Sequence, residues 1–160
     1  MSKAFTSESD DGEDVFMPPP LPLGIKNYMT PEGAARLTAE IKKLQNEKDL
    51  LNAQEPLARS RREKIDARLS YLVQRFDAVH VLDPRRQPRD RVLFGARVTV
   101  RDAAGHQDVW RIVGIDEMDL DQGDISWTSP LATVLLDKQV NDRIPFLNRV
   151  LTILDIQYPC

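Results

Sequence analysis

The chain has one cysteine, two histidines and no long apolar run, and each shortage excludes a class of protein. The single cysteine, Cys160, has no partner for an internal disulfide, so nothing indicates an oxidising compartment. His80 and His106 are far apart in the sequence with no second histidine or cysteine nearby, which disfavours a zinc or nucleophilic site. No stretch is long enough to cross a bilayer, and the polar, acidic opening is unlike a secretory signal, so we expect a cytoplasmic protein without membrane contact.

The sequence also lacks the loops that bind phosphate or calcium. No glycine-rich phosphate loop is present. The acidic stretch 119–124 has its glycine one place too early for an EF-hand loop, and Pro130 stands where the closing glutamate belongs. We therefore expect an acidic solvated loop there, no catalytic residue, and no metal or cofactor of the protein's own.

Charge is unevenly distributed along the chain, although the net charge is only -3. Acids dominate the first 14 residues and again the part after Val92, whereas the middle is basic. A pI near 5.4 disfavours a dedicated duplex-DNA binder. A basic stripe lies in the middle and comprises Arg59, Arg61, Arg62, Lys64 and Arg68. This stripe is either a surface that contacts phosphates or the solvated flank of a helix, and the sequence leaves both open.

The stretch from Thr30 to His80 predicts two helices joined by a tight reversal. Thr30 can cap the first helix, and Pro31 suits its first position. Apolar residues recur at steps of three and four, the spacing of a coiled-coil seam: Leu37, Ile41, Leu44 and Leu51, then Ile65, Leu69, Leu72, Phe76 and Val79. The first helix should end near Ala53. The second should start at Pro56, with Ser60 as the alternative start.

The remaining segments give an α+β fold with four parts. Residues 1–27 predict an unstructured acidic and proline-rich leader, 28–82 an antiparallel coiled-coil hairpin, and 83–91 a charged linker. Residues 92–160 predict a mostly antiparallel β domain. Strands are expected from Val92 to Val100, at 109–115, at 124–128 and at 149–158, with one short helix after Ser129.

Several motifs, in order and over nearly the whole chain, resemble the bacterial Gre family of transcription factors, and its GreB members most of all. They include residues 2–6, 27–33 and 64–72. The most specific are 92–96 (VLFGA), 111–117 (RIVGIDE) and 125–132 (ISWTSPLA). The resemblance implies a coiled coil on an FKBP-like domain that docks at the secondary channel of RNA polymerase, with Ile125, Ser129 and Pro130 as candidate contacts. Family members of this kind are accessory factors, and transcript cleavage is catalysed by the polymerase itself.

The tip of the hairpin departs from the family pattern. Family tips carry paired carboxylates that help to hold a second Mg²⁺ at the polymerase active centre, and metal-assisted hydrolysis requires such clustered ligands. Here Glu55 is the only acid at the predicted reversal, with Asp49 and Glu47 one or two turns below. The arms are also shorter by about eight residues each, or roughly 12 Å.

Three hypotheses follow from this departure. The first is a monomeric Gre-type regulator that binds RNA polymerase at the secondary channel, with weak or absent stimulation of transcript cleavage and only indirect contact with RNA and DNA. The second is an active cleavage factor that uses Glu55 with Asp49 or Glu47 and shares the polymerase's Mg²⁺. The third, of another class, is a coiled-coil module for a partner other than polymerase.

Overall fold

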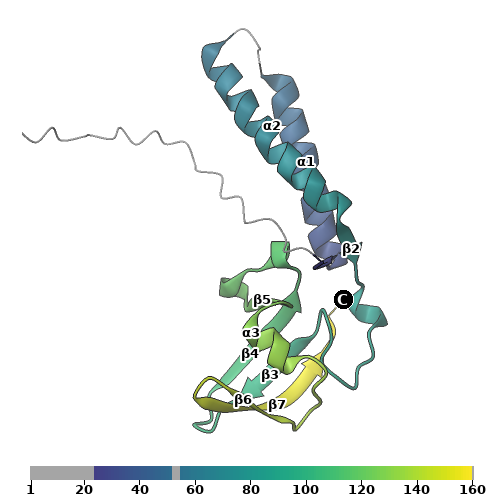
Figure 1. The fold of residues 1–160 in the computed structure, drawn as a ribbon, viewed down its shortest axis with the longest axis vertical. Coiled ribbons are helices and arrows are strands. Elements are labelled where there is room, and N and C mark those ends of the chain that lie inside the picture. The colour runs from purple at the N-terminus through teal and green to yellow at the C-terminus, as the bar shows by residue number, and fades with distance from the viewer. Residues whose placement is uncertain (1–23, 52–54, 160) are drawn as a thin grey trace, which may run out of the picture.

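The computed structural model describes residues 24–51 and 55–159, and it shows a helical hairpin projecting from a globular α+β domain (Figure 1). The helices are α1 (Pro31–Leu50), α2 (Pro56–Asp77) and α3 (Pro130–Leu135), with 3-10 turns η1 (Pro84–Arg86), η2 (Ile115–Glu117) and η3 (Leu120–Gln122). The strands are β1 (Asn27–Met29), β2 (Val79–Val81), β3 (Arg97–Arg101), β4 (Gln107–Val113), β5 (Asp124–Ser126), β6 (Arg143–Phe146) and β7 (Arg149–Gln157). The α+β class predicted from the sequence is confirmed. None of the helices in the described part of the chain is long and apolar enough to cross a membrane.

The two helices of the hairpin start where their caps predict. The Thr30 side chain accepts a hydrogen bond from the Gly33 amide at 3.1 Å, and Pro31 occupies the first turn of α1. The second helix starts at Pro56, so the alternative start at Ser60 is wrong. The first helix ends at Leu50, because the Leu51 amide turns back to the Lys48 carbonyl at 3.2 Å. The predicted end near Ala53 and the reversal at 52–54 lie outside the described residues.

The predicted seam is confirmed in its centre and corrected at its base. Leu37, Ile65 and Leu72 are buried between the helices. Phe76, which the spacing places in the seam, is instead 43% exposed, and the neighbouring Arg75 is 6% exposed. The helix ends one residue later, at Asp77, and the chain passes into β2, so the base of the hairpin is closed by strand pairing rather than by a last turn of coiled coil.

A two-stranded parallel sheet at the base of the hairpin was not predicted. Strand β1 pairs with β2 in the register Asn27 to Val79 and Met29 to Val81. Asn27 and Met29 are each 1% exposed, so Asn27 belongs to the folded part of the chain and not to the leader, contrary to the prediction. Residues 24–26 precede β1 and belong to no helix or strand, and residues 1–23 of the predicted leader lie outside the described residues.

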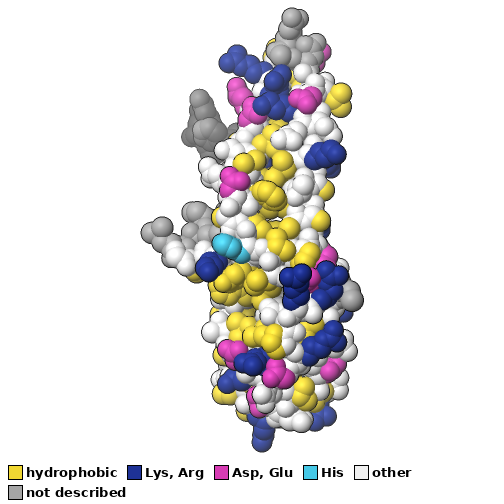
Figure 2. All heavy atoms as spheres, turned by 90° about the vertical axis from the view of Figure 1, so that its right-hand side faces the viewer, with side chains coloured by type: hydrophobic (Ala, Val, Ile, Leu, Met, Phe, Trp, Pro, Cys, Tyr) yellow, Lys and Arg dark blue, Asp and Glu magenta, His cyan; other side chains and the backbone are white. Residues whose placement is uncertain are grey.

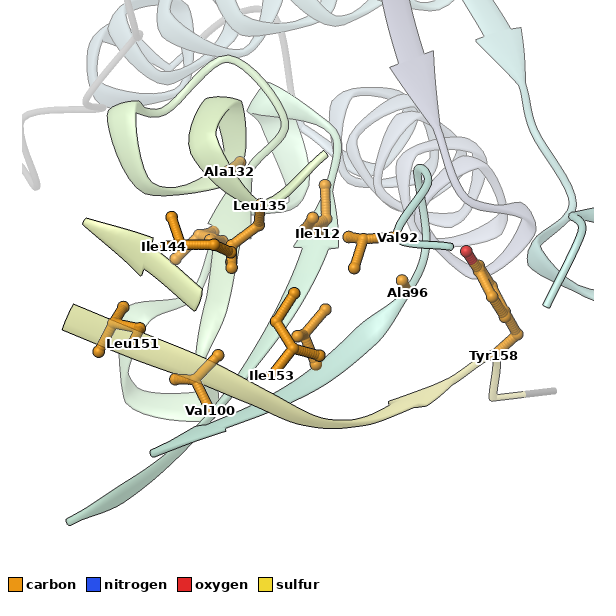
Figure 3. Packing of buried hydrophobic residues seen from close by; sticks show 12 residues of the cluster. Val92, Ala96, Val100, Ile112, Ala132, Leu135, Ile144, Leu151, Ile153 and Tyr158 are labelled. Atoms are coloured by element: carbon orange, nitrogen blue, oxygen red, sulfur yellow. The ribbon is translucent and has the colours of Figure 1, made fainter. Parts of the chain in front are cut away.

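The globular domain is a five-stranded sheet in the order β5-β4-β3-β7-β6, antiparallel except for the β4–β5 pair. The helix α3 contributes Ala132 and Leu135 to a core with Ile112 and Ile144, and Figure 3 shows these side chains gathered between α3 and the sheet. Ser129 caps α3, as predicted, by accepting a hydrogen bond from the Ala132 amide at 3.2 Å. The expected strand from Val92 begins only at Arg97, and β6 was missed.

Candidate functional site: the hairpin and its anchor

The acidic residues near the hairpin tip do not form a cluster. Glu55 precedes α2 and is exposed, and its side chain makes no capping hydrogen bond. Asp49 is exposed on α1. Glu47 is already engaged, because its carboxylate accepts a hydrogen bond from Arg61 Nε at 2.8 Å. Among residues 24–51 and 55–159, no three His, Cys, Asp or Glu side chains lie close enough together to hold a metal ion.

The same end of the hairpin presents apolar side chains to solvent. Leu50 is 87% exposed and Leu57 is 86% exposed, on either side of the reversal. Further down α2, Val73 and Phe76 are also exposed. Figure 2 shows hydrophobic side chains in a band that runs along one face of the hairpin and continues onto the globular domain. The described part of the tip therefore exposes apolar side chains beside its acids.

Two residues of the predicted basic stripe, Arg61 and Arg68, form an arginine ladder together with Arg75, which was not part of the stripe. These residues are seven apart, so they lie along one edge of the helix facing α1. Arg61 pairs with Glu47, and Arg68 pairs with Glu40 at 2.9 Å. These ion pairs join the two helices, so the charges of Arg61 and Arg68 are compensated within the hairpin.

The other three members of the stripe are not part of the ladder. Arg59 lies 3.5 Å from Glu63 on its own helix, and Lys64 is exposed. Arg62 is half-buried. Lys48 on α1 pairs with Asp66 on α2, so this ion pair also joins the two helices. Within the described residues, Arg62 and Lys64 have no ion-pair partner, and only these two of the five predicted residues leave their charge uncompensated.

The third residue of the ladder, Arg75, pairs with the globular domain instead of with α1. Arg75 Nε donates to Asp116 Oδ2 at 3.0 Å, and Arg75 Nη2 donates to Asp116 Oδ1 at 2.6 Å. The two side chains are only 7% and 14% exposed. Burial alone would lower the pKa of Arg75, but its hydrogen bonds and its attraction to Asp116 raise that pKa overall. Arg75 therefore stays charged and closes the pair.

Tyr71 and Asn27 connect this rung to its surroundings. The Tyr71 ring lies 5.6 Å from the guanidinium carbons of both Arg68 and Arg75, so it bridges the second and third rungs. Asn27 Nδ2 donates to Asp116 Oδ2 at 3.2 Å and to the Arg75 carbonyl at 3.3 Å. Asp116 thus binds α2 and β1 together.

The next residue of η2, Glu117, holds the other helix. Its Oε2 accepts hydrogen bonds from the Thr30 amide at 3.0 Å and the Gly114 amide at 2.8 Å, and its Oε1 accepts one from the Thr30 hydroxyl. The side chain is buried, and it occupies the space that a Cβ on Gly33 would need. We call Asp116 and Glu117, with Asn27, Thr30 and Arg75, the anchor.

The three residues predicted to contact polymerase differ in how exposed they are. Ile125 is 4% exposed and belongs to the core, so its side chain is not available to a partner in this structure. Ser129 is half-buried and serves as the α3 cap, whereas Pro130 next to it is exposed. Two of the motifs on which the resemblance rests, residues 27–33 and 111–117, supply all of the anchor except Arg75. Sequence reasoning singled out both motifs, yet it did not find that they bind each other.

Known proteins resemble this chain over most of its length. Residues 87–158 match the family model for the C-terminal part of the transcription elongation factors GreA/GreB. The transcription elongation factor GreB of Pseudomonas aeruginosa is 36% identical over 151 residues, a match that covers 82% of this chain and 90% of the relative. GreB of Neisseria meningitidis is 32% identical over 154 residues, covering 83% and 94%. The solved structure of GreA/GreB from Nitrosomonas europaea aligns with 83% of this chain and 100% of its own, at 20% identity and a TM-score of 0.42.

Proposed function

The chain belongs to the GreA/GreB family of transcription elongation factors, and from this premise we propose that it binds RNA polymerase and places its hairpin in the secondary channel. Support comes from the arrangement of a hairpin anchored on a globular domain, which gives the protein one part to dock and one part to insert. Exposed Pro130, beside the capping Ser129, is the docking contact that we favour. Through polymerase the protein would act in the cytoplasm, as a monomer, and meet RNA and DNA only indirectly.

We further propose that it stimulates transcript cleavage weakly or not at all. The observation that carries this proposal is the state of the tip acids: Glu47 is paired with Arg61, and among the described residues Glu55 belongs to no group of three or more side chains that could hold a metal ion. A Mg²⁺ ion takes oxygen ligands at about 2.0–2.1 Å, so one isolated carboxylate is a weak site. The protein would be an accessory factor, and any Mg²⁺ would be shared with the polymerase active site.

We propose that the globular domain is FKBP-like, as the family resemblance implies; the packing of α3 against a mostly antiparallel sheet supports this proposal. Such a fold does not by itself confer prolyl isomerase activity. We assign this domain the role of docking.

Binding to polymerase is tested directly by pull-down with core RNA polymerase. We expect the full chain to be retained at micromolar concentration, and Pro130→Asp to reduce retention, since a charge there would be desolvated on docking. Ala103→Asp, which places a charge on the exposed β3–β4 turn instead, is the matched control and should bind normally. No retention of the unaltered chain would refute the proposal.

The second and third hypotheses are separated from the first by a photocrosslinker at residue 55. The second, an active cleavage factor, is favoured by the exposure of Glu55 and Asp49, and it predicts crosslinks beside the polymerase active centre. The first predicts crosslinks to the channel wall. The third, a partner other than polymerase, predicts crosslinks to neither.

A further inference from the structure

We infer that the anchor sets the direction in which the hairpin leaves the globular domain, and that Arg75, Asp116, Glu117 and Thr30 are positioning residues for the tip. The geometric part of this inference stands by itself. Its consequence at polymerase rests on the proposed function.

The covalent structure alone does not fix this direction. Only one segment, residues 83–91, joins the hairpin to the globular domain, and a body tethered at one point can swing unless other contacts hold it. Part of that segment is held in place, because Pro84 is buried and the Gln87 amide group donates to the Phe94 carbonyl at 3.3 Å. The helices themselves need a separate attachment.

The turn η2 provides that attachment with two consecutive carboxylates. Asp116 holds the end of α2 through Arg75, and Glu117 holds the start of α1 through Thr30. Because the two contacts hold the ends of two antiparallel helices, a rocking motion that lifts either arm off the domain would stretch at least one of them. A single turn therefore restrains both arms.

The arrangement is specific as well as buried. Arg75 is bidentate to Asp116, which fixes the plane of the guanidinium as well as its distance. Glu117 accepts two backbone amides and one hydroxyl, so its oxygens are also oriented. Separating either pair would leave a charge with little access to water, which is costly for partly buried ions. Alternative tilts are thus disfavoured even where the apolar contacts would tolerate them.

The arginine ladder explains why the third rung belongs to the domain. In register with Glu47 and Glu40, the next position on α1 seven residues earlier is Gly33. This residue has no side chain to pair with Arg75, and the space that a side chain would fill is occupied by Glu117. The periodic pairing of the hairpin is therefore completed by Asp116, and the hairpin and domain share one continuous row of ion pairs.

Small changes in direction matter at the tip because the hairpin is long. At 1.5 Å per residue, the 20 residues of α1 span about 30 Å, so a tilt of about 20° would move the tip by about 10 Å. A misplacement of even about 1 Å weakens a positioned contact substantially. The anchor therefore fixes where the tip lies relative to the docked domain.

Pulsed electron spin resonance measures this direction without polymerase. Spin labels at Leu57→Cys near the tip and Asp121→Cys on the domain, in a Cys160→Ser background, report their distance distribution. Arg75→Met should broaden or shift that distribution. Arg68→Met is the matched control, because it breaks a rung at the same helix position within the hairpin, and it should leave the distribution narrow. An Arg75→Met distribution as narrow as that of the parent would overturn the inference.

A second pair of variants keeps the test decisive if Arg75→Met does not fold. Thr30→Ser retains the hydroxyl that Glu117 accepts and should keep the parent distribution, whereas Thr30→Val should broaden it. Equal distributions for the two would count against the anchor.

The same variants separate the anchor from the function. Arg75→Met should still be retained by core polymerase, but a photocrosslinker at residue 57 should lose at least about tenfold in yield to its normal site. Undiminished crosslinking would refute the positioning role. If polymerase retains neither the parent nor any variant, the proposed function fails, while the spin-label distances still decide whether the anchor directs the hairpin.

Discussion

Gly33 shows how closely one residue is constrained where α1 passes the globular domain. In a helix, alanine is normally better than glycine by about 0.5–1 kcal/mol. Here an added methyl would overlap the Glu117 carboxylate, whose position is fixed by Thr30 and Gly114. The flexible end of a side chain can usually move aside, but this one is held by its hydrogen bonds.

We therefore predict that Gly33→Ala lowers the free energy of unfolding by about 2 kcal/mol, opposite in sign to helix propensity. Urea unfolding followed by circular dichroism measures it. Ala35→Gly, at an exposed position of the same turn, is the control and should show only the ordinary propensity loss. If Gly33→Ala proves more stable than the parent, the anchor is looser than described.

Asp124 is a carboxylate whose surroundings oppose its charge. Burial raises its pKa, Arg111 opposes that rise, and Asp119 adds to it, so the net direction is upward from the ordinary value of 3.8. A raised folded-state pKa means that the native state binds the proton more tightly than the unfolded state. The native state therefore loses stability as pH rises through that pKa.

It follows that Asp124→Asn should raise the melting temperature slightly at pH 7. The gain should disappear as pH falls below the ordinary carboxyl pKa, where both states of the parent are protonated. Thermal unfolding between pH 3.5 and 7 tests the sign. Asp121→Asn on the exposed η3 turn serves as control, and a gain for Asp124→Asn that persists at the acid end would contradict the pKa argument.

At the scale of elements, the ion pairs of the arginine ladder become more buried from the start of α2 to its end. The Arg61 and Glu47 side chains are 65% and 30% exposed, and those of Arg75 and Asp116 are 7% and 14% exposed. Coupling energies should follow this order, because exposed pairs are screened by water and salt. We predict a coupling of about 0.5 kcal/mol or less for Arg61–Glu47 and about 2 kcal/mol or more for Arg75–Asp116.

Double-mutant cycles at 0.05 M and 0.5 M salt measure both couplings. The Arg61–Glu47 coupling energy should be smaller at the higher salt concentration, and the Arg75–Asp116 coupling energy should change little. Glu47→Gln, Asp116→Asn and the changes of Arg61 and Arg75 to Met keep the side-chain volumes comparable. Equal couplings at the two ends would mean that the third rung is not a buried attachment.

The elements that sequence reasoning found are those specified by neighbouring residues. The caps at Thr30 and Ser129 and the proline at position 56 act within one turn, and the structure confirms all three starts. Strands β1 and β2, of three residues each, are too short to show an alternating pattern. Strand β6 contains Pro145, which is unusual within a strand.

The anchor could not be predicted, because its partners are distant in sequence. Arg75 and Asp116 are 41 residues apart, and Thr30 and Glu117 are 87 apart. No local rule selects Arg75 from the many arginines of α2, or turns Phe76 outward in its place. The exposure of Phe76 follows only once Arg75 is drawn to Asp116.

At the scale of the whole molecule, we infer that the globular domain directs the hairpin, while the described residues of the tip include no cluster of three or more side chains that could hold a metal ion. Direction and reach would suffice for a factor that occupies the secondary channel. They would not suffice for one that supplies carboxylates to a second Mg²⁺. The protein should therefore compete with intact Gre factors for polymerase.

The most direct test adds the protein to stalled, backtracked transcription complexes, alone and against an intact Gre factor. The central claim predicts little or no transcript cleavage by the protein alone, and a dose-dependent loss of the cleavage stimulated by the intact factor. The Arg75→Met variant should inhibit less than the parent, because its tip is no longer directed. Robust cleavage by the parent that is abolished by Glu55→Gln would contradict the claim and establish the protein as an active cleavage factor.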